Sequence, residues 1–171
     1  IPGPKQPTIL TPKSVSNKTL PGVTKAILIG ISTGGPKALL EMLPGLSDKV
    51  YLPVFIVQHM PPNFTLSLAK SLDSKCRHTV VECSDNDTVK NDHIYIAQGG
   101  KYMALRQVGS QGIMTVTNED PQENGCRPSV DVLFRSAAQV YGKDAITVIM
   151  TGMGADGREG SRMLKTAGST I

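Results

Sequence analysis

The sequence predicts an α/β domain, with a doubly wound, mainly parallel sheet, helices on both faces and an antiparallel hairpin. Two observations lead to this prediction. Short apolar runs rich in β-branched residues recur along the chain, and three of them are followed by a turn and then a segment of helical period. Strand, loop and helix in this alternation are typical of a parallel sheet whose crossover helices cover both faces.

The first half of the chain contains two of these strand–loop–helix units. A helix is expected over residues 37–43, with Pro36 near its first position and Pro44 at its end. A second helix is expected over residues 65–72. Apolar or alternating runs predict the strands, which are 26–31, 54–57, 79–83 and 93–97.

The second half adds the hairpin and the third unit. Residues 102–108 and 113–117 alternate apolar and polar side chains around a Gly-containing turn, which predicts an antiparallel pair. An amphipathic helix is expected over residues 129–141, with Ser129 as its N-cap and Gly142 as its stop. The remaining expected elements are a strand at 145–150, a helix at 158–166 and the start of a further strand near residue 171.

Residues 1–24 differ in composition from the rest of the chain. They hold five of the 12 prolines, three lysines and no acidic residue, which predicts an interdomain linker or tail and leaves residues 25–171 as the domain. The whole chain has a formal charge of +4, but residues 25–171 carry 15 basic and 14 acidic residues. This near-neutral domain, with few aromatic residues, argues against nucleic acid as a partner. Its apolar runs are far shorter than a membrane span.

The cysteines are three in number and lie at Cys76, Cys83 and Cys126. An odd count without a CxxC pair argues against a disulfide framework and against a zinc site. We therefore expect a reducing compartment, the cytoplasm, and no bound metal.

Three predicted loops follow strongly apolar strands and contain Ser32, His59 and Asp156. In doubly wound sheets, sites form beyond the carboxyl ends of the strands. A serine hydroxyl needs a nearby base to act as a nucleophile, and a carboxylate orients and stabilises that base. The helix after Ser32 and the 152–154 loop offer backbone N–H groups for an oxyanion. These loops therefore favour acyl-transfer chemistry.

Each residue also has an ordinary structural interpretation. Ser32 could cap a helix, His59 could be a structural histidine, and Asp156 could form an Asx-turn. A non-catalytic nucleotide-binding domain is a second functional hypothesis, because a Gly-rich loop follows the first strand. That loop lacks the G-x-G-x-x-G pattern, and the second strand ends without the acidic residue that would hold a ribose. An interaction module that only docks on a partner is a third hypothesis.

Four blocks, taken together, resemble the chemotaxis protein-glutamate methylesterase family, CheB. Their order and spacing agree with the family from about residue 26 to residue 171. The blocks are Ile29-Gly-Ile-Ser32-Thr-Gly-Gly-Pro36, Val57-Gln-His59-Met-Pro-Pro62, Arg127-Pro-Ser-Val-Asp-Val-Leu-Phe134 and Thr151-Gly-Met-Gly-Ala-Asp156-Gly157.

The resemblance implies an enzyme that removes methyl groups from glutamate γ-methyl esters on the cytoplasmic helices of methyl-accepting chemoreceptors, and that also deamidates receptor glutamines. It implies Ser32 as nucleophile, His59 as general base and then acid, and Asp156 as the residue that orients His59. Thr33 and the backbone N–H of Met153 would serve the oxyanion. No metal or organic cofactor is implied, and a glutamine-specific deamidase is a close alternative.

The sequence departs from the family pattern in three ways. These 171 residues contain no counterpart of the N-terminal receiver domain that members commonly carry, and we expect residues 1–24 to be part of the linker that joins the two domains. Ile31 stands where the family frequently has alanine, a change beside Ser32 that would tighten the turn. The chain ends soon after the Asp156 block, so the C-terminal end of the domain is expected to be incomplete.

Overall fold

A computed structural model describes residues 23–109 and 112–171. The predicted linker, residues 1–24, therefore lies outside the described residues except for its last two positions. Within the described residues, no helix is both long enough and apolar enough to cross a membrane.

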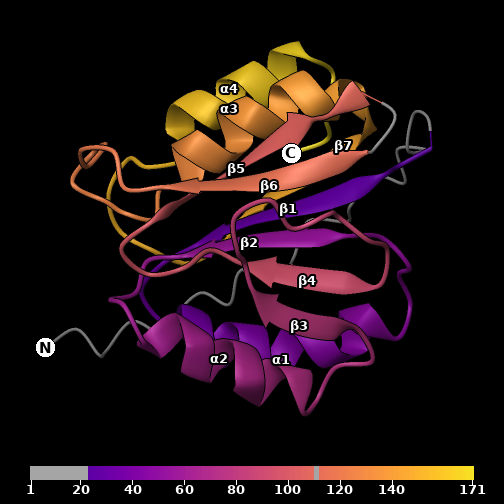
Figure 1. Cartoon of the computed structure of the whole chain (residues 1–171), viewed down its shortest axis with the longest axis vertical. Helices are drawn as coiled ribbons and strands as arrows, with labels where there is room; N and C mark the ends of the chain where they lie inside the picture. The colour runs from indigo at the N-terminus through magenta and orange to yellow at the C-terminus, as the bar shows by residue number, and fades with distance from the viewer. Residues whose placement is uncertain (1–22, 110–111) are drawn as a thin grey trace, which may run out of the picture.

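A parallel sheet of five strands forms the centre of the molecule (Figure 1). Its strand order is β3-β4-β2-β1-β7, and all four neighbouring pairs are parallel, as the strand–loop–helix pattern predicts. The hairpin strands β5 and β6 pair antiparallel as predicted, but residues 110–111 of its expected turn lie outside the described residues. The strands are β1 (Ala26–Ile31), β2 (Val54–Gln58), β3 (Thr79–Glu82), β4 (His93–Ile96), β5 (Tyr102–Gln107), β6 (Ile113–Asn118) and β7 (Ala145–Ile149).

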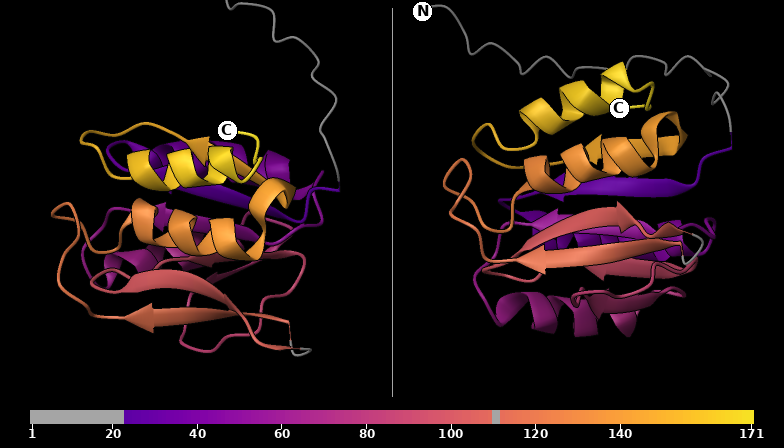
Figure 2. Two further views of the ribbon diagram at one scale, coloured as in Figure 1. Left: turned by 90° about the horizontal axis from the view of Figure 1, so that it is seen from above. Right: turned by 45° about the horizontal axis from the view of Figure 1, so that its top comes forward.

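Helices cover both faces of the sheet, because alternate residues of the central strands point to opposite sides. Ile27 and Ile29 of β1 pack toward helices α1 (Gly35–Ser47) and α2 (Phe64–Asp73). Leu28 packs toward α3 (Val130–Val140), α4 (Arg158–Thr166) and the hairpin. Figures 1 and 2 show these layers on the two sides of the sheet. The doubly wound fold predicted from the sequence is confirmed.

The prediction that Pro44 ends the first helix is wrong. Helix α1 continues through Pro44 to Ser47, although proline cannot donate a backbone hydrogen bond. Leu43 and Ser47 are both buried, and the Ser47 hydroxyl donates to the Pro44 carbonyl at 2.8 Å. Packing of this last turn against the core therefore outweighs the hydrogen bond that Pro44 cannot make.

The second half of the domain follows its sequence-based prediction closely. Ser129 is the N-cap of α3, and its hydroxyl accepts from the Val132 N–H. Gly142 has a positive φ of 50° and begins a short 3₁₀ helix, Gly142–Asp144, which ends the α-helical run. After α4, Thr170 forms a single parallel bridge to Ile146 of β7.

Candidate active site

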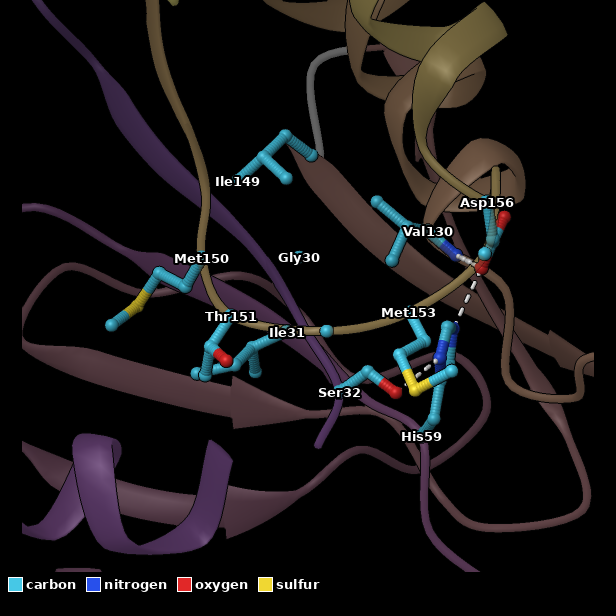
Figure 3. A pocket seen from close by; sticks show the side chains of 12 residues that line it. Gly30, Ile31, Ser32, His59, Val130, Ile149, Met150, Thr151, Met153 and Asp156 are labelled. Carbon is cyan, nitrogen blue, oxygen red and sulfur yellow. Dashed lines mark hydrogen bonds and ion pairs between the residues drawn. The ribbon is translucent and has the colours of Figure 1, made fainter. Parts of the chain in front are cut away.

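Ser32, His59 and Asp156 meet at the edge of the sheet where its strands have their carboxyl ends (Figure 3). Ser32 follows β1, His59 follows β2, and Asp156 lies in the loop between β7 and α4. The neighbouring strands β1 and β7 lead to helices on opposite faces of the sheet, which opens a crevice between their ends. The fold therefore brings together three residues that are up to 124 positions apart in the sequence.

The three side chains form one hydrogen-bonded chain. His59 Nδ1 lies 3.1 Å from Ser32 Oγ, and His59 Nε2 lies 2.7 Å from Asp156 Oδ2. Because a carboxylate only accepts, Nε2 must carry the proton in this arrangement, and Nδ1 is then free to accept from the serine hydroxyl. The sequence predicted the three residues, but it gave no indication of which ring nitrogen faces which partner.

Asp156 is held by the N-terminus of α3. Its Oδ1 accepts from the Ser129 hydroxyl at 2.7 Å and from the Asp131 N–H at 3.0 Å. Its Oδ2 accepts from the Val130 N–H at 2.7 Å, in addition to the bond from His59. Both carboxylate oxygens therefore occupy the positive end of the helix dipole, which fixes the orientation of the carboxylate.

The Asp156 carboxylate is ionised at neutral pH. Its side chain is only 3% exposed, and this burial by itself would raise its pKa. The hydrogen bonds from His59, from the N–H groups of Asp131 and Val130, and from the Ser129 hydroxyl outweigh the burial, so the pKa is lowered. A permanent negative charge therefore lies next to His59 Nε2.

Two glycines permit the close packing behind these side chains. A Cβ on Gly30 of β1 would lie 2.5 Å from Val130 Cγ1, so glycine lets the start of α3 approach the strand. A Cβ on Gly152 would lie 2.8 Å from Ser32 Cβ, so glycine lets the loop after β7 pass directly beside the serine. The first contact positions the start of α3, which holds Asp156, and the second positions the loop beside Ser32, so that both side chains reach the His59 ring.

Gln58 fixes the loop that carries Ser32. Its side chain is buried, and its amide donates to the Ser32 carbonyl at 2.9 Å and to the His59 carbonyl at 3.2 Å. The Ser32 N–H donates to the Thr151 carbonyl at 2.9 Å. The backbone on both sides of Ser32 is therefore anchored.

Thr33 and Met153, the predicted oxyanion residues, flank Ser32. Thr33 is exposed, and Met153 is 84% exposed, with its side chain in front of Ser32 and His59 (Figure 3). The backbone N–H groups of both residues form no hydrogen bond with another residue that the structure describes. They are therefore free to donate, while the Ser32 N–H is already engaged.

Two cavities adjoin His59. The smaller one, of about 100 Å³, is lined by Ser32, Asp156 and Met153, among others. The larger one, of about 420 Å³, is lined by Met60, Pro61, Pro62, Gly100, Gln122, Gly125, Cys126, Arg127 and Pro128 together with His59. His59 therefore lines both cavities, whereas Ser32 and Asp156 line only the smaller of the two.

Sequence reasoning missed two features of this site. Ser129 was predicted only as a helix cap, whereas its hydroxyl also donates to Asp156. Cys126 entered only the cysteine count and was assigned no place in the site, whereas its thiol lies near both His59 and Asp156. The Arg127–Phe134 block could have indicated the first, because it matched the family pattern without containing an expected catalytic residue. Burial and the nearby charge of Asp156 raise the pKa of the Cys126 thiol, which is therefore protonated at neutral pH.

A doubly wound sheet with a Ser–His–Asp chain at its carboxyl edge defines an α/β domain with the side-chain arrangement of serine hydrolases. Comparison with known proteins specifies the class further. The family model described as "CheB methylesterase" matches residues 27–171. The chain belongs to this family.

Similar proteins agree with this assignment. A "Protein-glutamate methylesterase/protein-glutamine glutaminase" of Desulfotalea psychrophila is 46% identical over 92% of this chain and 43% of the relative. One of the same name from Trichodesmium erythraeum is 40% identical over 93% of this chain and 45% of the relative. The crystal structure of the Thermotoga maritima CheB methylesterase catalytic domain matches with a TM-score of 0.82 and 39% identity, over 87% of this chain and 78% of that one. The chain thus spans less than half the length of these two curated relatives.

Proposed function

We propose that this chain is a methylesterase domain that hydrolyses glutamate γ-methyl esters on the cytoplasmic helices of chemoreceptors, with release of methanol. The observation that carries the proposal is the hydrogen-bonded order Ser32–His59–Asp156. The names of the relatives support the ester substrate and add glutamine deamidation as a second activity. Such an enzyme would act in the cytoplasm, where these receptor helices lie.

The first half of the reaction would form an acyl-enzyme. Ser32 Oγ attacks the ester carbonyl carbon while His59 Nδ1 accepts the hydroxyl proton. The imidazolium that results keeps its hydrogen bond from Nε2 to Asp156, whose negative charge stabilises it. Collapse of the tetrahedral intermediate breaks the bond to the methoxy oxygen, and His59 gives its proton to that oxygen, so that methanol leaves.

The second half would return the enzyme to its starting state. A water molecule attacks the acyl carbon while His59 Nδ1 accepts one of its protons. The bond to Ser32 Oγ then breaks, and His59 returns the proton to the serine. The products are a glutamate side chain on the receptor and the free hydroxyl. Side chains and backbone N–H groups supply every function in these steps, so the proposal includes no cofactor.

Thr33 and Met153 would stabilise the oxyanion through their backbone N–H groups. Thr33 follows Ser32 in the chain, Met153 lines the smaller cavity together with Ser32, and neither N–H is engaged with another described residue. A donor of this kind typically contributes about 10²–10³ to the rate. The free N–H groups are thus the feature of the site that would distinguish the transition state from the bound ester.

Glutamine deamidation would use the same groups. A γ-carboxamide presents the same carbonyl to Ser32, and the leaving group becomes ammonia, which also needs a proton from His59. One site would therefore produce the same glutamate from either side chain, and the leaving group would tell the two reactions apart.

The test is to incubate the chain with receptor fragments that carry methylated glutamates, unmodified glutamates or glutamines. We expect methanol from the first, no product from the second and ammonia from the third. Methanol without ammonia would restrict the activity to esters. Ammonia without methanol would favour a dedicated deamidase, and the absence of both would refute the proposed function.

A further inference from the structure

We propose that His59, Cys126 and Asp156 form an inhibitory binding site for a thiophilic divalent cation, with Zn²⁺ as the physiological candidate. One ligand atom from each of these residues lies within 4.8 Å of those of the other two. The residues come from three separate segments, after β2, before α3 and before α4. The binding step stands on this geometry alone, and only its inhibitory consequence rests on the proposed function.

The donor set suits zinc rather than harder cations. Imidazole nitrogen, thiolate sulfur and carboxylate oxygen are the three ligand types that proteins use for Zn²⁺. Three protein ligands leave a fourth tetrahedral position for water. Mg²⁺ and Ca²⁺ require mostly oxygen ligands, of which this cluster offers one residue. The ligand chemistry of the site therefore favours Zn²⁺ over Mg²⁺ and Ca²⁺.

Small movements would complete the coordination. In a tetrahedral zinc site the ligand atoms lie about 3.3–3.7 Å apart, from metal–ligand distances of about 2.0–2.3 Å. His59 Nε2 and Asp156 Oδ2, now 2.7 Å apart, must separate slightly, and the Cys126 thiol already lies within 4.8 Å of both of these residues' ligand atoms. Asp156 is fixed by α3, so the adjustment falls on the His59 ring and on Cys126.

The Cys126 side chain is free to adjust to a bound cation. Its backbone is held, because its N–H donates to the Glu123 carbonyl and its own carbonyl accepts from the Tyr102 hydroxyl. Its thiol forms no hydrogen bond with another residue that the structure describes, and it lines the 420 Å³ cavity together with His59. A hydrated cation would reach both ligands through this cavity, which Ser32 does not line.

Metal binding would reverse the protonation pattern that catalysis needs. A cation on Nε2 displaces the proton of that nitrogen, and the neutral imidazole then carries its proton on Nδ1. Nδ1–H donates to Ser32 Oγ instead of accepting from it, so His59 can no longer act as a base. The Cys126 thiol releases its proton to solvent, which makes one proton released for each cation bound.

The binding test uses Cd²⁺, whose thiolate bond absorbs in the ultraviolet, and needs no enzyme assay. We expect one Cd²⁺ per chain to produce this absorption in the wild type and in Cys76→Ser. We expect the absorption to be lost in Cys126→Ser and in Cys126→Ala, each checked for folding by circular dichroism. Absorption that persists in both Cys126 variants, or that disappears in Cys76→Ser, would refute the site. Cys76 is the matched control because it is half-buried and follows α2 on another part of the domain.

The inhibition test measures methanol release against Zn²⁺ concentration, with each variant normalised to its own rate without metal. We expect Zn²⁺ to inhibit the wild type, EDTA to reverse the inhibition, and Mg²⁺ to have no effect. Cys126→Ser should raise the inhibitory concentration at least about tenfold, the lower range for loss of a residue that supports a metal site. Equal inhibition of wild type and Cys126→Ser would refute the regulatory role. Cd²⁺ binding at Cys126 in a chain without methylesterase activity would refute the proposed function and leave the metal site standing.

Discussion

The N-termini of helices α1 and α3 lie at the same edge of the sheet, but their surroundings differ. At α3, the Asp156 carboxylate accepts from the N–H groups of Val130 and Asp131, and the Ser129 hydroxyl accepts from the N–H of Val132. At α1, no side chain caps the helix, and the Thr33 N–H just before it forms no hydrogen bond with another described residue.

The two helix N-termini suit two kinds of negative charge, one permanent and one that forms only during the reaction. The charge on Asp156 is permanent, so the α3 donors can be fully occupied and can orient the carboxylate. The charge on an oxyanion exists only during the reaction, so its donors must be unoccupied beforehand. In the proposed mechanism, the N-terminus of α3 fixes Asp156, which orients the base His59, whereas the N-terminus of α1 would flank the reacting carbonyl.

The largest effect is expected from Asp156→Asn, which disrupts the hydrogen bonds at the N-terminus of α3. Each oxygen of Asp156 accepts two hydrogen bonds, so an amide NH₂ at either position would face two donors. His59 would lose its orientation or its proton position, and kcat for methanol release should fall about 10⁴-fold, as when a triad carboxylate is replaced. Asp144→Asn, at an ion pair with Lys25 near the start of β7, is the control and should keep wild-type kcat. A kcat for Asp156→Asn within tenfold of wild type would contradict this role.

A smaller effect is expected from the unoccupied donors beside Ser32, which are the Thr33 N–H before α1 and the Met153 N–H in the loop between β7 and α4; Met153→Pro removes the second of them. The loss of one oxyanion donor should lower kcat about 10²–10³-fold with little change in KM. Met153→Ala keeps the N–H and is the matched control, because it removes the exposed side chain only. Equal losses in both variants would mean that the side chain acts rather than the backbone.

Ser129→Ala should have a moderate effect on both stability and rate. It removes the cap of α3 and one of the four hydrogen bonds to Asp156. The free energy of unfolding in urea should fall by about 1 kcal/mol, the usual effect of losing an N-cap. Ser67→Ala, on the exposed side of α2, serves as the control. The role of Ser129 would be disproved if the two variants were equally stable.

The smallest expected effect is on the pH dependence of stability. The folded-state pKa of Asp156 is lowered, so its contribution to stability is present above the unfolded-state pKa, about 3.9, and is lost as the pH falls through the folded-state value. Between pH 6 and pH 3 the wild type should therefore lose more stability than Asp156→Asn, as measured by urea unfolding. Other carboxylates are common to both proteins and cancel in the difference. Parallel curves would show that Asp156 gains no stabilisation from α3.

Much of the fold could be predicted because its determinants are local. Each buried strand is a short apolar run, and Ser129 and Gly142 mark the ends of α3 by their own side-chain and backbone chemistry. Pro44 was misjudged because its tolerance depends on the burial of Leu43 and Ser47, which is set by packing against residues distant in sequence.

The composition of the site could be predicted better than its geometry. Parallel strands bring their carboxyl ends together, so Ser32, His59 and Asp156 could be expected at one edge. The ring nitrogen that faces Ser32 depends on how α3 holds Asp156, and this contact joins segments 25 residues or more apart. Cys126 near His59 is likewise a consequence of tertiary packing, which no spacing of cysteines in the sequence indicates.

The most direct test of the catalytic role of this site is methanol release by Ser32→Ala compared with the wild type, on the same methylated receptor fragment. We predict a fall in kcat of at least about 10⁴-fold with the fold intact by circular dichroism, because the attacking oxygen is lost while its surroundings remain. Turnover close to that of the wild type would contradict Ser32 as the nucleophile and, with it, the acyl-enzyme mechanism.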